Sequence, residues 1–204
     1  QETWSSENWQ NLAKYTYTYD SNDYMTNSLN ERWDNSTNSY KNSSQSNYTN
    51  NGNGIVQQSI SQNWNATTNN WENSQRSTYT YNSSDKTTTI IQETWSSENW
   101  QNLAKYTYTF DSNDHTTNFL YERWDNLTNS YKNISQTNLT YNGNGTIQQS
   151  ISQNWNTTTN NWENSQRSTY YYLTLSLTDN YLSNKISVYP NPTSENLYFS
   201  EPVN

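Results

Sequence analysis

The side chains able to carry acid–base or nucleophilic chemistry are few and follow a repeat. The sequence has one histidine, His115, and no cysteine, so thiolate nucleophiles are excluded and a single imidazole remains for proton transfer. His115 stands in a turn where the earlier copy of the same segment has Tyr24. A general base would not alternate with tyrosine between copies. We therefore expect His115 to be a solvent-exposed turn residue.

The carboxylates also recur with the repeat and do not form an isolated pair. Glu93, Glu98, Asp125 and Glu163 each belong to a repeated segment. Such repetition is typical of polar residues on a sheet surface, not of an acid and base placed on either side of a scissile bond. A nucleophile elbow, a P-loop and a dinucleotide fingerprint are all absent from the sequence. The prediction is a protein that is not an enzyme and that uses no cofactor.

The sequence DSND at residues 20–23 returns at residues 111–114. Asp20, Asn22 and Asp23 could offer oxygen ligands to calcium, but the spaced acidic ligands and the closing glutamate of a calcium loop are missing. Asp and Asn also stabilise tight turns through their own side chains. We expect turns here and no metal ion.

The sequence contains a long internal repeat. The segment that begins at Gln1 returns almost unchanged at Gln92, a period of about 91 residues. This divides the sequence into a first long repeat unit at residues 1–91 and a second at residues 92–172, each with three hairpins, and a distinct tail at residues 173–204. Within each unit, a tryptophan followed by a second aromatic recurs about every 29 or 31 residues.

The aromatic residues supply most of the large apolar surface. Ten Trp, nineteen Tyr and three Phe stand in a chain of which only 28% is hydrophobic. The recurring pairs are expected either to pack in a core or, as exposed flat rings, to bind a ligand. These positions are Trp4, Trp9, Trp33, Tyr40, Trp64, Trp71, Trp95, Trp100, Trp124, Tyr131, Trp155 and Trp162.

Alternation with a period of two predicts strands. One face of the segment 71–82 is expected to carry Trp71, Asn73, Gln75, Ser77, Tyr79 and Tyr81, with a wholly polar face opposite. Val56, Ile60 and Trp64 are likewise expected to share a face. Asn-Gly pairs at residues 51–54 and 142–145 predict hairpin turns. The expected fold is all-β, an up-and-down antiparallel meander of about twelve strands of roughly ten residues each, without substantial helix.

A sheet with one aromatic face must hide that face by curling, by winding into a superhelix or by packing on another copy. Its edges can also pair with another chain. Gln1 aligns with Gln92, which is expected inside a strand that begins before Ile90. The first strand is thus expected to be incomplete, which favours pairing with a strand of a neighbouring chain.

Two segments resemble known families. The tract YTYTYDSNDYMT resembles the tyrosine–aspartate hairpin repeats of RHS-type shell proteins. The tract KISVYPNPTSENLYFSE at residues 185–201 looks like the opening of the C-terminal sorting domain of type IX (Por) secretion in Bacteroidetes. The matching signature is Val188, Tyr189, Pro190, Asn191 and Pro192. This second resemblance implies export to the extracellular space or the outer cell surface of a Gram-negative bacterium.

Net charge and hydropathy limit the classes of partner that the sequence predicts. A formal net charge of -8 provides no basic surface for nucleic acid. The sequence lacks an apolar run near the roughly 20 residues of a transmembrane helix. We therefore expect a secreted, cell-surface structural or adhesive β-repeat protein that self-associates as a homo-oligomer or as a filament joined by strand edges. The alternative is a carbohydrate-binding module that binds surface glycans through its Trp and Tyr rows.

Overall fold

A computed structural model describes residues 1–5 and 8–172. The chain divides into two compact units, Gln1–Thr169 and Tyr170–Asn204. All of the described strands lie in the first unit. In the second unit the described residues are the exposed Tyr170, Tyr171 and Tyr172. The sorting-like motif at residues 188–192 lies outside the described residues.

The described part of the chain is built from strands and contains no helix, so no helical segment there could cross a membrane. The strands are β1 (Glu2–Ser5), β2 (Asn8–Asn11), β3 (Ala13–Tyr19), β4 (Met25–Asp34), β5 (Ser39–Asn50), β6 (Val56–Asn65), β7 (Asn70–Asn82), β8 (Thr87–Ser96), β9 (Asn99–Phe110), β10 (Thr116–Asp125), β11 (Ser130–Tyr141), β12 (Ile147–Asn156) and β13 (Asn161–Thr169).

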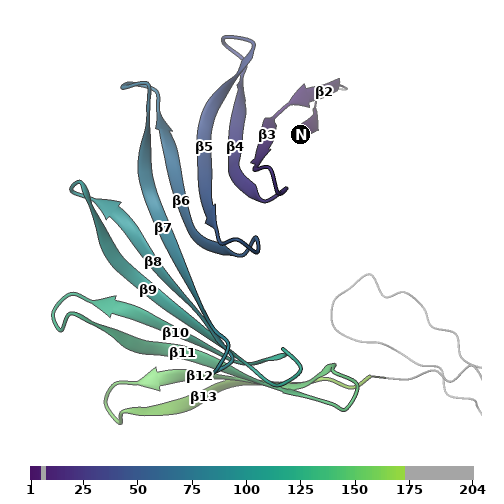
Figure 1. Cartoon of the computed structure of the whole chain (residues 1–204), viewed down its shortest axis with the longest axis vertical. Helices are drawn as coiled ribbons and strands as arrows, with labels where there is room; N and C mark the ends of the chain where they lie inside the picture. Colours follow the sequence, from purple (N-terminus) through teal and green to yellow (C-terminus); the bar gives the residue numbers. More distant parts are fainter. Residues whose placement is uncertain (6–7, 173–204) are drawn as a thin grey trace, which may run out of the picture. The chain divides into compact units, whose positions relative to one another are not determined.

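Strands β3 to β13 form one 11-stranded sheet in which each strand pairs with its neighbours in the sequence (Figure 1). Every pair is antiparallel, and β1 and β2 form a separate two-stranded sheet. The sheet is open, because its first and last strands do not pair with each other. The prediction of an all-β antiparallel meander is confirmed.

The long repeat is visible in the pairing. Trp4 is the backbone partner of Trp9 in β1 and β2, as Trp95 is of Trp100 in β8 and β9. The single strand β9 covers the segment that the first unit divides into β2 and β3. This division explains why the sheet elements number one more than the expected twelve.

The connections use residues that tolerate a positive φ. Gly54 and Gly145 end the two Asn-Gly turns with φ of 77° and 82°. Most of the other positive-φ residues are Asn or Asp, such as Asn69 at 51° and Asp23 at 62°. Asn and Asp adopt the left-handed conformation more readily than other non-glycine residues. The residues that begin the turns, such as Asp20 and Asn65, accept local backbone N–H groups, so the predicted turn chemistry matches the structure.

The predicted face of β7 is wrong because the strand contains a bulge. Ser61 is paired with Gln75 and Gln62 with Asn73, so Ser74 is an extra residue in β7. An extra residue reverses the alternation of all later side chains. Tyr79 and Tyr81 therefore lie on the face opposite to Trp71. An extra residue at position 57 likewise separates Val56 from Ile60, whereas Ile60 and Trp64 share a face as expected.

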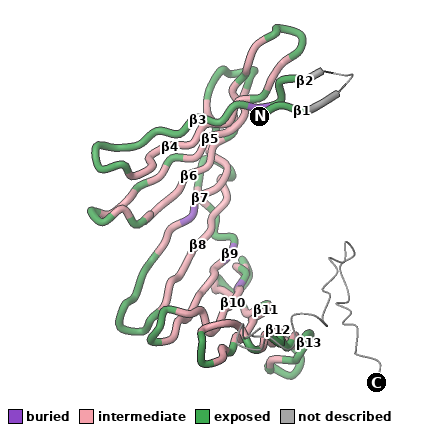
Figure 2. The backbone as a smooth tube through the Cα atoms, turned by 90° about the vertical axis from the view of Figure 1, so that its right-hand side faces the viewer, coloured by how far each residue is buried: buried purple, intermediate pink, exposed green. Residues whose placement is uncertain are grey.

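The sheet is a single layer. Its extensive contacts are all between strands that are neighbours in the sheet. Within the described residues the buried hydrophobic side chains are Ala13 and Ala104, and the buried polar ones are Ser77 and Glu122. Most strand residues are half-buried and most connections are exposed, shown pink and green in Figure 2. The expected hidden aromatic face is thus not covered within one described chain.

Candidate functional site: the tryptophan face

The aromatic pairs of the sequence come together across hairpin tips. Ten of the twelve predicted residues form five edge-to-face pairs with ring centroids 4.9–5.1 Å apart and planes inclined by 68–72°. This geometry is the favourable one for ring quadrupoles. The pairs are Trp33–Tyr40, Trp64–Trp71, Trp95–Trp100, Trp124–Tyr131 and Trp155–Trp162. Trp4 and Trp9 are opposite each other in the backbone register of β1 and β2.

The five pairs lie on one face of the sheet. Residues directly opposite in neighbouring strands point to the same side, so the register can be followed from β4 to β13. Each of the five hairpins contains a bulge, and the extra residue reverses the alternation of the side chains that follow it. As a result, every hairpin presents its aromatic pair on the same side of the sheet. We call this side the tryptophan face and the opposite side the tyrosine face.

Amide side chains form ladders on the tryptophan face. Asn27 donates to Gln45 at 3.2 Å, Gln45 donates to Gln62 at 2.8 Å, and Gln62 donates to Asn73 at 2.9 Å. The second unit repeats the ladder with Asn118, Gln136, Gln153 and Asn164 at 3.2, 2.7 and 2.9 Å. Each ladder ties four strands together through hydrogen bonds between neutral groups.

Between strands that the amide ladders do not connect, ion pairs occupy the equivalent register position. Arg76 of β7 donates two hydrogen bonds of 2.6 Å to the carboxylate of Glu93 in β8, and its guanidinium lies 4.8 Å from the ring centre of Trp100. Lys105 pairs with Glu122 at 2.6 Å and Lys14 with Glu31 at 2.8 Å. Hydrogen bonding to Glu93 raises the pKa of Arg76, which keeps the guanidinium group charged.

The sequence interpretation treated Glu93 as surface decoration and missed both the ladders and the ion pairs. A signal for them was present, because Lys14, Gln45 and Arg76 recur about every 31 residues, as do their partners Glu31, Gln62 and Glu93. Matching the two series would have indicated one side-chain pair per junction. The structure supplies the register that joins them.

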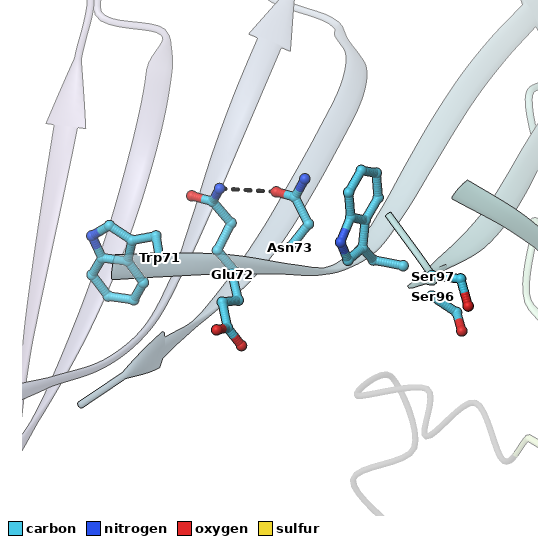
Figure 3. A pocket seen from close by; sticks show the side chains of 7 residues that line it. Trp71, Glu72, Asn73, Ser96 and Ser97 are labelled. Carbon is cyan, nitrogen blue, oxygen red and sulfur yellow. Dashed lines mark hydrogen bonds between the residues drawn. The ribbon is translucent and has the colours of Figure 1, made fainter. Parts of the chain in front are cut away.

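A groove of about 580 Å³ lies between two neighbouring hairpin tips. It is lined by Trp71, Glu72, Asn73 and Gln62 from β6 and β7, and by Trp95, Ser96 and Ser97 from the next hairpin. Gln62 donates a hydrogen bond of 2.9 Å to Asn73. Figure 3 draws this bond as the dashed line that ends at Asn73. Indole rings next to amides and hydroxyls suit a polyhydroxylated ligand, with a ring face for C–H groups and polar atoms for hydroxyls.

Further aromatic residues of the described strands lie on the tyrosine face. Tyr106 stacks on Tyr121 at 5.2 Å, and Tyr108 lies 4.9 Å from Phe119. Burial raises the pKa of Tyr106, so its phenol is neutral at physiological pH. Both faces therefore bear aromatic residues, in contrast to the expected wholly polar second face.

The environment of His115 differs from the exposed turn position predicted for it. Its ring stacks on Tyr141 with centroids 4.7 Å apart, and Nδ1 lies 3.2 Å from Asp111 Oδ2. The histidine is half-buried because its ring lies against Tyr141 of β11 and next to Gly145.

In the first copy of this turn, Asp20 Oδ1 accepts the backbone N–H groups of Asn22 and Tyr24 at 2.8 and 3.0 Å. This bonding is the turn chemistry that the sequence predicted for DSND.

Asp34 gives a pH-dependent prediction. Hydrogen bonds from the Ser36 and Thr37 side chains lower its pKa from 3.8 to about 2. Because the folded-state pKa is depressed, the contribution of this carboxylate to stability is complete above the unfolded-state value and is lost as pH falls through about 2. We expect its NMR carboxyl signal to titrate near pH 2, and amide exchange in turn 35–38 to quicken in Asp34→Ala at pH 7. Asp34→Asn is the control, because Asn65 bonds the backbone of the equivalent turn. A normal titration near 3.8 would contradict the prediction.

No protein family model and no curated protein matches the sequence. Solved structures are similar in fold. A protein of unknown function from Bacteroides fragilis has a TM-score of 0.56 and 15% identity, over 61% of this chain and 90% of that one. DUF3836 family proteins from Bacteroides vulgatus and Parabacteroides distasonis have TM-scores of 0.40 and 0.36 and identities of 22% and 18%. Each match spans 45% of this chain, and 90% and 88% of the other chain respectively.

The first of these likenesses concerns the fold alone. Together with the described strands, it places the chain in a class of open antiparallel β-sheet proteins built from consecutive hairpins.

Proposed function

We propose that the chain is a secreted, cell-surface structural or adhesive β-repeat protein that joins further copies through the outer strands of its sheet. The observation that carries this proposal is the single-layer sheet of 11 strands with β3 and β13 as its outermost members. Export is supported by the sorting-like tract at residues 185–201 and by the Bacteroides source of the similar structure. The proposal assigns no catalytic activity.

The outermost strands have few of the features that prevent edge pairing. Strand β3 has the sequence AKYTYTY, and its one charged residue, Lys14, forms an ion pair with Glu31. Neither β3 nor β13 contains proline, and Tyr15, Tyr17 and Tyr19 are each more than half exposed, at 51%, 53% and 55%. Unpaired backbone groups at such an edge are a template for another strand.

Sedimentation velocity over a range of concentrations, with electron microscopy of the same samples, tests the proposal. We expect species that grow with concentration and appear as filaments. A purely monomeric profile at all concentrations would refute self-association.

The groove between Trp71 and Trp95 favours a second candidate function, the binding of surface glycans. A glycan array is expected to show binding by the unchanged protein and loss of binding by Trp71→Ala. The matched control is Leu127→Ala, because Leu127 is 95% exposed in a turn away from the groove. Equal glycan binding by the parent and Trp71→Ala, with unchanged circular dichroism, would exclude this groove as the site.

A further inference from the structure

Each junction between consecutive hairpins of the sheet contains one matched pair of side chains. The pairs occupy equivalent register positions on the tryptophan face, with an ion pair or an amide pair at every junction. They are Lys14–Glu31, Gln45–Gln62, Arg76–Glu93, Lys105–Glu122 and Gln136–Gln153.

Two charged residues of this pattern have no such partner among the described residues. Arg167 follows Gln136 at the same interval at which Arg76 follows Gln45, and it lies in the outermost strand β13. Glu2 precedes Glu31 at the interval at which Glu93 precedes Glu122, and it lies in β1. Both side chains are exposed. One molecule thus presents the basic half of a junction on β13, at the edge of the 11-stranded sheet, and the acidic half on β1 of the two-stranded sheet.

We propose that Arg167 of one copy pairs with Glu2 of a second copy, so that β13 and β1 join in the register of β7 and β8. The corresponding neighbours would be Gln166 with Thr3 and Ser168 with Gln1, as Gln75 pairs with Thr94 and Ser77 with Gln92. The inference rests on the proposed self-association and specifies its partner and register.

The in-chain junction shows that these two surfaces fit. Residues 162–169 read WENSQRST, identical to residues 71–78 in β7, and residues 1–13 are identical to residues 92–104 in β8 and β9. The β7–β8 contact already joins the first long repeat unit to the second. Because β13 and β1 repeat the sequences of β7 and β8, they can form the same antiparallel ladder and the same two-pronged contact between arginine and glutamate.

The charges at positions 167 and 2 also favour a head-to-tail joint over a symmetric one. A symmetric joint of β13 with β13 around position 167 would oppose two guanidinium groups, and a joint of β1 with β1 around position 2 would oppose two carboxylates, both of which are unfavourable. The head-to-tail joint pairs opposite charges. Because such a joint is heterologous, it continues from copy to copy and gives a closed ring where the rotation closes and an open filament where it does not.

Charge reversal of each partner tests the joint. Arg167→Glu opposes two carboxylates and Glu2→Arg opposes two guanidinium groups. Each variant alone is therefore expected to raise the concentration needed for assembly by at least about tenfold. A 1:1 mixture of the two variants restores opposite charges at every joint and is expected to assemble like the parent protein. The double variant carrying both changes is expected to assemble on its own.

Arg123→Glu and Glu98→Arg are the matched controls, because they reverse exposed charges on the internal strand β10 and in the turn between β8 and β9, and should leave assembly unchanged. Circular dichroism confirms that each variant keeps the parent's strand content. If the parent assembles and the single variants assemble equally well, or if their mixture does not recover, the proposed joint is wrong while self-association stands. If the parent stays monomeric at every concentration, self-association itself fails.

Discussion

Trp64→Ala is expected to lower the free energy of unfolding by about 2–3 kcal/mol. The Trp64 ring meets Trp71 edge-to-face with centroids 5.1 Å apart, and both residues are half-buried. The variant loses the pair geometry, worth about 0.5–1.5 kcal/mol, together with part of the burial of a large apolar side chain. In a single-layer sheet few other side chains can move in to replace these contacts. Urea denaturation followed by far-ultraviolet circular dichroism measures the loss.

Leu127→Ala is the control for this variant. Leu127 is 95% exposed in the turn after β10, so its removal is expected to change the free energy of unfolding by no more than about 0.5 kcal/mol. If Trp64→Ala unfolded at the same urea concentration as the parent and Leu127→Ala, the aromatic pairs would have no structural role. The tryptophan face would then be better explained as a ligand surface.

Gly54→Ala is expected to destabilise the hairpin of β5 and β6 by about 2 kcal/mol or more. Gly54 has a φ of 77°, which alone costs a non-glycine residue about 1–2 kcal/mol. A Cβ at this position would also lie 2.5 Å from Cδ1 and 2.8 Å from Cζ of Tyr24, so the tyrosine ring must move. Urea denaturation and the amide exchange rates of β5 and β6 measure the effect.

The same turn provides the control. Gly52 has no atom within 4 Å of an added Cβ and is not among the positive-φ glycines, so Gly52→Ala is expected to be close to neutral. Repeating Gly54→Ala in a Tyr24→Ala background separates the two causes, because only the backbone cost remains there. Equal stability of Gly54→Ala and Gly52→Ala would show that the turn accommodates the methyl group without strain.

The strand order could be predicted from the sequence because all of the strand pairing is local in the chain. Every strand pairs with its sequence neighbour, so turns such as residues 51–54 and alternating polar and apolar residues suffice to place it. The aromatic pairs, including Trp64–Trp71, follow from the same short loops, because a tight hairpin brings residues on either side of its turn opposite each other. The polar connectors between them are short and rich in Asn and Thr.

The faces could not be predicted in the same way. Ser74 and its counterpart Ser165 are extra residues within the β6–β7 and β12–β13 hairpins, and nothing in their type marks them as bulges. Each one shifts the alternation by one residue, so an interpretation that counts alternate residues through Ser74 assigns Tyr79 and Tyr81 to the wrong side. Only the paired register of two strands reveals the shift.

The sequence by itself determined the elements of this protein, because the repeat, the turn residues and the strand-forming aromatics act over a few neighbouring residues. The tertiary structure decided which side chains meet between hairpins. Arg76 reaches Glu93 and Gln45 reaches Gln62 only because the bulged strands align in one register. The structure also decided that the sheet stays a single layer, because burial depends on what lies across each face and not on the order of residues along a strand.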